Sequence, residues 1–96
     1  MEYKIIQSPS KGTLEAISKR VSAGMFDKIE NFDAIGLIQG RMIDMIYAMD
    51  VAEKAAGVTV LDVKGSCPQN MILVGIFGDT ASVKSAVEAV QKAFEK

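Results

Sequence analysis

Residues 34–63 read AIGLIQGRMIDMIYAMDVAEKAAGVTVLDV, and this stretch decides the fold. It opens on the apolar run Ala34 to Ile38, which predicts a short buried strand. Residues Arg41 to Ala56 contain neither glycine nor proline, which favours a helix that Gly57 ends. Val58 to Val63 is rich in β-branched residues and predicts the next strand. Within the helix, apolar side chains recur at helical spacing at Ile43, Ile46, Tyr47 and Val51.

The C-terminal third adds one more strand and one more helix. Met71 to Phe77 predicts a strand, and the turn-forming residues before it predict a hairpin. Asp79 is placed to cap the last helix. The buried stripe of that helix is expected at Val83, Ala86, Val87, Val90 and Phe94. This order predicts an α+β domain, in which helices pack on one face of an antiparallel-containing sheet in a ferredoxin-like layering.

The N-terminal third is less regular. Glu2 to Gln7 predicts a short strand that turn residues close. Local propensity predicts a helix over Thr13 to Ser22, because its apolar residues are spaced like one helix face. Met25 to Phe32 has room for about two further turns of helix.

Composition excludes several classes of function. The 96 residues form one domain, and a net charge of −1 gives no electrostatic footprint for nucleic acid or an acidic membrane. No apolar run approaches the ~18 residues of a membrane span, and the first residues do not resemble a targeting signal, so we expect a cytoplasmic protein. With no histidine and one cysteine, the chain lacks a Ser–His or Cys–His pair and cannot complete a cysteine-based metal site alone. We therefore do not expect an enzyme.

The apolar content is high for so small a domain. Hydrophobic residues make up 49% of the chain, yet aromatic residues only 6%. A small domain has proportionally the most surface to cover with polar groups. A core rich in alanine and valine would raise the apolar count, but the composition favours a surface that other copies of the chain cover.

Cys67 is the strongest candidate for a metal-binding residue. It lies in the turn-rich connection Lys64 to Asn70. It either replaces a serine in a turn, or it ligates a metal if symmetry brings several copies together. The methionines of the first predicted helix, Met42, Met45 and Met49, are assigned to packing rather than to a soft-metal site.

Three motifs together resemble a bacterial microcompartment (BMC) shell domain. They are the strand Ala34 to Ile38, the helix end DVAEKAA from Asp50 to Ala56, and the helix entry GDTASVK from Gly78 to Lys84. The order of elements is similar to that of circularly permuted members of the family. On that resemblance we expect a strand at Thr13 to Arg20, against local propensity, and a short helix at Ala23 to Asn31. Residues 1–12 are then expected to form a permuted N-terminal extension near a sixfold axis.

The family resemblance implies a flat homohexamer that tiles edge to edge with other shell proteins and encloses enzymes. Lys54 stands where the family has its hexamer-edge lysine. The segment Gly65 to Asn70 stands where the family has the loop that lines the central pore. Sixfold symmetry would place six copies of Cys67 around one axis, which exceeds the four thiolates that an iron–sulfur cluster usually takes.

The pore segment, with Gly65, Ser66, Cys67, Pro68 and Gln69, looks like that of the iron–sulfur-binding shell proteins of glycyl-radical-enzyme microcompartments. We therefore expect a shared cluster, [4Fe–4S] in type, bound through Cys67, that either carries electrons across the shell or serves as a redox-sensitive plug. Gly65 would let the backbone approach the axis, and Pro68 would fix the segment's shape. Ser66 and Gln69 would bond to the sulfurs.

Two other functions stay open at this point. The first is a shell hexamer whose pore passes small metabolites, with Cys67 as a spectator. The second is a small regulatory domain that binds a ligand between subunits. The size of the oligomer separates this second function from a shell hexamer.

Overall fold

The computed structural model describes residues 1–29, 32–65 and 71–95. In chain order the elements are β1 (Glu2–Gln7), α1 (Lys11–Ser18), the 3₁₀ turn η1 (Phe26–Lys28), β2 (Ala34–Arg41), α2 (Met42–Ala55), β3 (Thr59–Val63), β4 (Met71–Gly78) and α3 (Thr80–Ala93). The strands and helices expected after residue 33 are confirmed, and their boundaries differ from the expected ones by at most three residues.

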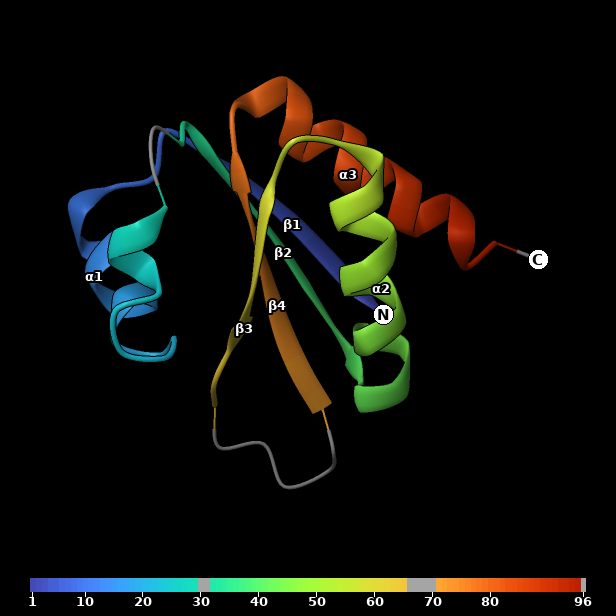
Figure 1. Cartoon of the computed structure of the whole chain (residues 1–96), viewed down its shortest axis with the longest axis horizontal. Coiled ribbons are helices and arrows are strands. Elements are labelled where there is room, and N and C mark those ends of the chain that lie inside the picture. The colour runs from blue at the N-terminus through green and yellow to red at the C-terminus, as the bar shows by residue number, and fades with distance from the viewer. Residues whose placement is uncertain (30–31, 66–70, 96) are drawn as a thin grey trace.

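The four strands form one antiparallel sheet in the order β1-β2-β4-β3 (Figure 1). Every residue of β1 pairs with β2, from Glu2 opposite Gln39 to Gln7 opposite Ala34. β1 is thus a strand of the same sheet as the rest of the domain. Its position relative to a sixfold axis stays a prediction.

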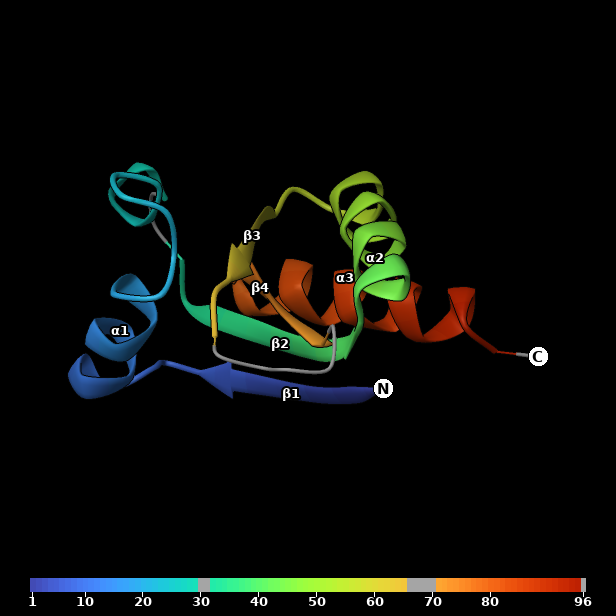
Figure 2. The same ribbon diagram turned by 90° about the horizontal axis from the view of Figure 1, so that it is seen from below.

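Helices cover both faces of the sheet rather than one (Figure 2). α2 and α3 cover one face, over a core that contains Ile38, Val74 and Ile76. α1 and η1 cover part of the other face, over a second core around Ile35 and Phe77. The expectation of helices on a single face was therefore wrong, because the apolar residues of the N-terminal third cover the second face.

The segment Thr13 to Arg20 is not a strand, contrary to the family resemblance. It lies mostly within the helix α1, which local propensity predicted in part. The side chain of Ser10 caps α1 by accepting from the backbone N–H of Thr13 (3.2 Å), and Ile17 is buried against the sheet. The apolar spacing and the cap decide this segment locally.

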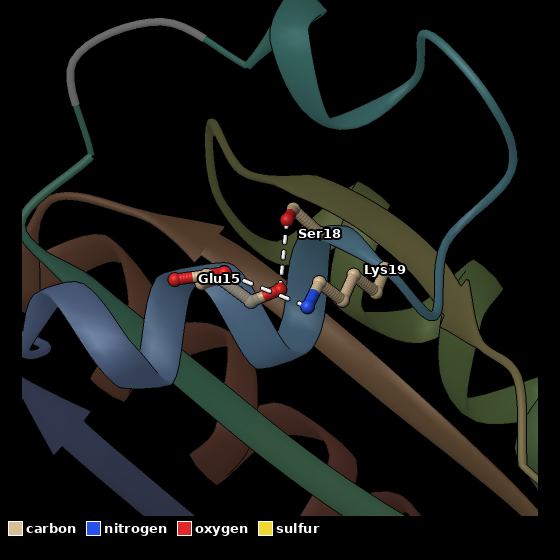
Figure 3. A network of polar contacts seen from close by, with 3 residues as sticks. All are labelled: Glu15, Ser18 and Lys19. Atoms are coloured by element: carbon tan, nitrogen blue, oxygen red, sulfur yellow. Dashed lines mark hydrogen bonds and ion pairs between the residues drawn. The ribbon is translucent and has the colours of Figure 1, made fainter.

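Polar contacts close the last turn of α1. The Ser18 hydroxyl donates to the carbonyl oxygen of Glu15 over 2.8 Å, and Nζ of Lys19 lies 3.5 Å from Oε1 of Glu15 (Figure 3). The helix expected at Ala23 to Asn31 is reduced, in the residues described, to the single turn η1.

α2 buries a face made of small residues and one methionine. Its buried residues are Met45, Ala48 and Ala52, which recur at helical spacing. Ile43, Ile46 and Tyr47 share a different face and are exposed. Packing is thus confirmed for Met45, whereas Met42 is 46% exposed in the single chain.

The entry to α3 follows its predicted cap. Oδ2 of Asp79 accepts from the backbone N–H of Ser82 (3.2 Å), and Oδ1 accepts from the Ser82 hydroxyl (2.7 Å). These bonds to the side chain and backbone of Ser82 lower the pKa of the Asp79 carboxyl. Val83, Val87 and Val90 are buried as expected, and Phe94 is half-buried.

Candidate functional site

The predicted pore segment connects β3 to β4. These two strands last pair with each other at Val63 and Leu73, Met71 and Ile72 still pair with β2, and Gly65 is exposed. Ser66, Cys67, Pro68 and Gln69 lie outside the described residues. The pairing of β3 with β4 therefore fixes where the segment starts and ends, and its chemistry remains a prediction.

Among the described residues, a single chain does not bring together enough side-chain ligands to hold a metal ion. No group of three or more acidic or cysteine side chains that could hold a metal ion occurs within 1–29, 32–65 and 71–95. Cys67 is the only cysteine in the sequence, and the sequence has no histidine. One thiolate per chain fits a cluster only where several copies share it, so a cluster would require an oligomer with Cys67 near its axis.

Lys54 lies exposed on the last turn of α2. Its Nζ is 2.9 Å from Oδ2 of Asp50, one helical turn earlier. The hydrogen bond to Asp50 and the charge of that carboxylate raise the pKa of Lys54. The exposed position suits contact with a neighbouring molecule. The contact itself remains a prediction.

An exposed apolar surface covers the first half of α2. We call it the α2 face, and it consists of Ile43, Ile46 and Tyr47, which are 78%, 60% and 52% exposed. The Tyr47 ring meets the Phe94 ring edge to face, with centroids 5.6 Å apart. Large adjacent apolar side chains left in water are typical of an interaction surface.

Sequence reasoning placed these residues on a helix but did not assign them to an outer surface. The available signal was the second apolar set on the same helix, at Met45, Ala48 and Ala52. When a helix has two apolar faces, only one of them can pack on its own sheet, and the other stays exposed.

A groove lies between the residues that follow α1 and the neighbouring ends of β2, β3 and β4. We call it the α1 groove, and its volume is about 930 Å³. Its apolar lining includes Val21, Val63 and Leu73, and its charged lining consists of Lys19, Arg20, Lys64 and Asp62. The backbone N–H of Lys64 donates to the carbonyl of Arg20 over 2.7 Å, which joins β3 to the end of α1 beside this groove. Sequence reasoning missed it because Arg20 and Lys64 are far apart in the chain.

The structure is thus an α+β domain with an exposed apolar helix face. The sequence model of the BMC domain matches residues 34–96, about two-thirds of the chain. The chain therefore belongs to the BMC domain family, and it is a microcompartment shell protein rather than an enzyme. None of the helices in the described ranges is long and apolar enough to cross a bilayer.

Solved structures of shell proteins support the same assignment over the whole chain. The ligand-free GrpU microcompartment shell protein from Clostridiales bacterium 1_7_47FAA is 50% identical, with a TM-score of 0.75 over 99% of this chain and 94% of that one. The ligand-free GrpU protein from Pectobacterium wasabiae is 29% identical, with a TM-score of 0.76 over 94% of this chain and 99% of that one. No curated protein matches the chain.

A more distant structure shares the permuted fold. The fused permuted hexameric shell protein MSM0275 from the RMM microcompartment is 19% identical, with a TM-score of 0.73 over 96% of this chain and 44% of that chain. At that identity the likeness concerns the fold alone. It confirms the expected likeness to permuted BMC domains.

Proposed function

We propose that this shell protein assembles as a cyclic homohexamer that holds an iron–sulfur cluster at its central axis through Cys67. The observation that carries the assembly is the α2 face, since Ile43 and Ile46 are more than half exposed in the single chain. Burying a side chain of this kind contributes about 1.5–3 kcal/mol. The hexameric number comes from the resemblance of the sequence motifs to the BMC family.

The cluster draws support from the donor chemistry of the sequence. Cys67 lies in the connection between β3 and β4, and both strands end at the same side of the sheet. Six chains around one axis would supply six thiolates, of which a [4Fe–4S] cluster uses four. Such a cluster supplies one-electron transfer when bound. The chain's own residues would hold it: Cys67 as ligand, with Gly65 allowing close approach of the backbone.

Lys54 and the likeness to GrpU shell proteins support the proposal that the hexamers tile into a shell. Lys54 is exposed and hydrogen-bonded to Asp50, so its ammonium is held at the surface of α2. It would pack against the neighbouring hexamer when hexamers tile edge to edge with other shell proteins. The enclosed enzymes would be those of a glycyl-radical pathway.

Anaerobic purification tests the cluster and the assembly separately. We expect a brown wild-type protein that contains iron and sulfide, shows the optical and EPR spectra of a [4Fe–4S] cluster, and has the native mass of a hexamer. Cys67→Ser should lose the colour and keep the hexamer, and Ser22→Ala, at an exposed serine outside the pore segment, should keep both.

Two results would overturn parts of the proposal. An iron-free wild type after reconstitution, or equal iron in wild type and Cys67→Ser, would remove the cluster and favour a pore for small metabolites. A dimer or trimer as the native species would remove the hexamer and favour a small regulatory domain.

A further inference from the structure

The α2 face and the α1 groove lie on opposite sides of the sheet. α2 packs with α3 on one side, over the core that includes Met45 and Val74. The groove shares Val21, Val63 and Leu73 with the core under α1, on the other side. In Figure 1, β3 and β4 extend below the level of α1. Met42, the first residue of α2, lines the groove.

Two different surfaces on opposite sides suit a head-to-tail contact. In a cyclic oligomer above a dimer, each interface joins one surface of a chain to a different surface of the next chain. A two-fold contact would instead join the α2 face to a second α2 face and leave the groove empty. The position of the two surfaces therefore favours the ring.

The α2 face itself is uncharged, and the charges that adjoin it are complementary to those of the groove. Asp50, Glu53 and Lys54 in the second half of α2 carry a net charge of −1. The groove carries two lysines, one arginine and one aspartate, a net charge of +2. Arg20 and Lys64 form no ion pair among the described residues, whereas Lys19 pairs with Glu15. Opposite charges on two matching surfaces favour their docking and penalise like-with-like contacts.

The apolar parts also correspond. The α2 face lies in the first half of the helix, and Asp50 and Glu53 lie in the second half. The groove has apolar residues along the sheet and basic residues at the end of α1 and of β3. One helix laid along the groove can thus bury its apolar half and set its acidic half near Arg20 and Lys64.

We propose that the α2 face of one copy packs into the α1 groove of the next copy, and that this contact is the repeating interface of the ring. The inference rests on the proposed cyclic assembly and names the surfaces that make it. The proposed occupant of the groove is a second copy of this chain, not a small anion or a different protein.

Two variants separate the two surfaces. The face variant Ile43→Gln/Ile46→Gln removes apolar side chains from α2, and the groove variant Arg20→Glu/Lys64→Glu reverses the charges of the groove. All four residues are exposed, so both variants should fold, which circular dichroism and thermal unfolding check. We expect each variant alone to be monomeric by native mass and sedimentation. Met25→Gln, at an apolar residue 37% exposed outside both surfaces, should keep the ring.

Mixing the two monomeric variants gives the deciding result. The groove variant still has an intact α2 face, and the face variant still has an intact groove. An equimolar mixture should therefore form a heterodimer with one working interface and nothing larger.

If the wild type forms a ring but the mixture stays monomeric, or the groove variant alone still forms the ring, the inference is wrong and the proposed function stands. A monomeric wild type would contradict the proposed function itself. Stoichiometric binding of inorganic phosphate in the groove of the wild-type ring would show that the groove is open to small anions, and would also contradict the inference.

Discussion

Gly36 on β2 lies so close to Val87 on α3 that an added Cβ would come within 2.9 Å of Cγ2 of Val87. The same Cβ would lie 3.1 Å from Cγ1 of Val83. Branched side chains on a buried helix face cannot swing away as the end of a long flexible side chain can. The absence of a side chain at Gly36 therefore sets how closely α3 approaches the sheet.

Gly36→Ala should destabilise the chain by about 1–3 kcal/mol, because α3 or the valines must shift. Gly12→Ala is the matched control: Gly12 lies in α1 with no atom within 4 Å of an added Cβ. There, alanine should stabilise by about 0.5–1 kcal/mol through its better helix propensity. Urea unfolding at one protein concentration measures both. A Gly36→Ala variant as stable as the wild type would show that the close contact has no energetic weight.

Met45→Ala and Met42→Ala should differ strongly although both lie on α2. Met45 is 0% exposed, so its truncation should cost about 2–5 kcal/mol through lost burial and a cavity. Met42 is 46% exposed, and its truncation should change the unfolding free energy by about 0.5 kcal/mol or less. Both are best compared in the Ile43→Gln/Ile46→Gln background, where folding is separated from assembly. Equal losses would mean that α2 is rotated from the orientation described.

Asp79→Ala should lower the Tm at pH 7 by several degrees, because α3 loses its N-cap. The pKa of the Asp79 carboxyl is lowered from its ordinary value of 3.8 by the bonds with Ser82. The stabilisation is therefore complete above the unfolded-state pKa and is lost as the pH falls through the folded-state pKa. The difference in Tm between wild type and Asp79→Ala should shrink below about pH 4. Asp79→Asn keeps an acceptor that does not titrate, so this variant should lack that pH dependence; a gap that persists unchanged at low pH would exclude the carboxylate as its source.

Lys54→Ala should leave the fold and the ring intact and prevent hexamers from joining into sheets. The Lys54–Asp50 pair is largely exposed, and such pairs contribute little to folding. Electron microscopy and pelleting measure sheet formation, and native mass measures the ring. Lys84→Ala, at an exposed lysine on α3, is the control that should still form sheets. Sheets formed equally well by Lys54→Ala would remove Lys54 from the edge contact.

Most of the fold could be predicted after residue 33, where strong local patterns agree with the final packing. Asp79 shows this, since its cap, the turn before it and the valine stripe after it all indicate one helix start. In the N-terminal third, the family resemblance predicted the wrong secondary structure for Thr13 to Arg20. Ser10 and the spacing of Leu14 and Ile17 already determine α1, and a local cap with an apolar face outweighs an expected family position.

The outer surfaces were harder to predict than the core. Apolar spacing alone does not say which of two faces of α2 meets the sheet; the small side chains of Ala48 and Ala52 decide this by allowing close helix approach. The groove depends on contact between Arg20 and Lys64, which only the folded chain brings together. Cys67 and its neighbours lie outside the described residues, so their role still rests on the sequence.

β4 is bonded on both sides, to β2 and to β3, and directly follows the segment that carries Cys67. Its amides should consequently be among the slowest in the chain to exchange with solvent deuterium. Because β4 is paired on both sides, we expect substitutions in residues 66–70 to leave β4 and α3 unchanged. Substitutions in this segment should therefore change its chemistry without changing the fold.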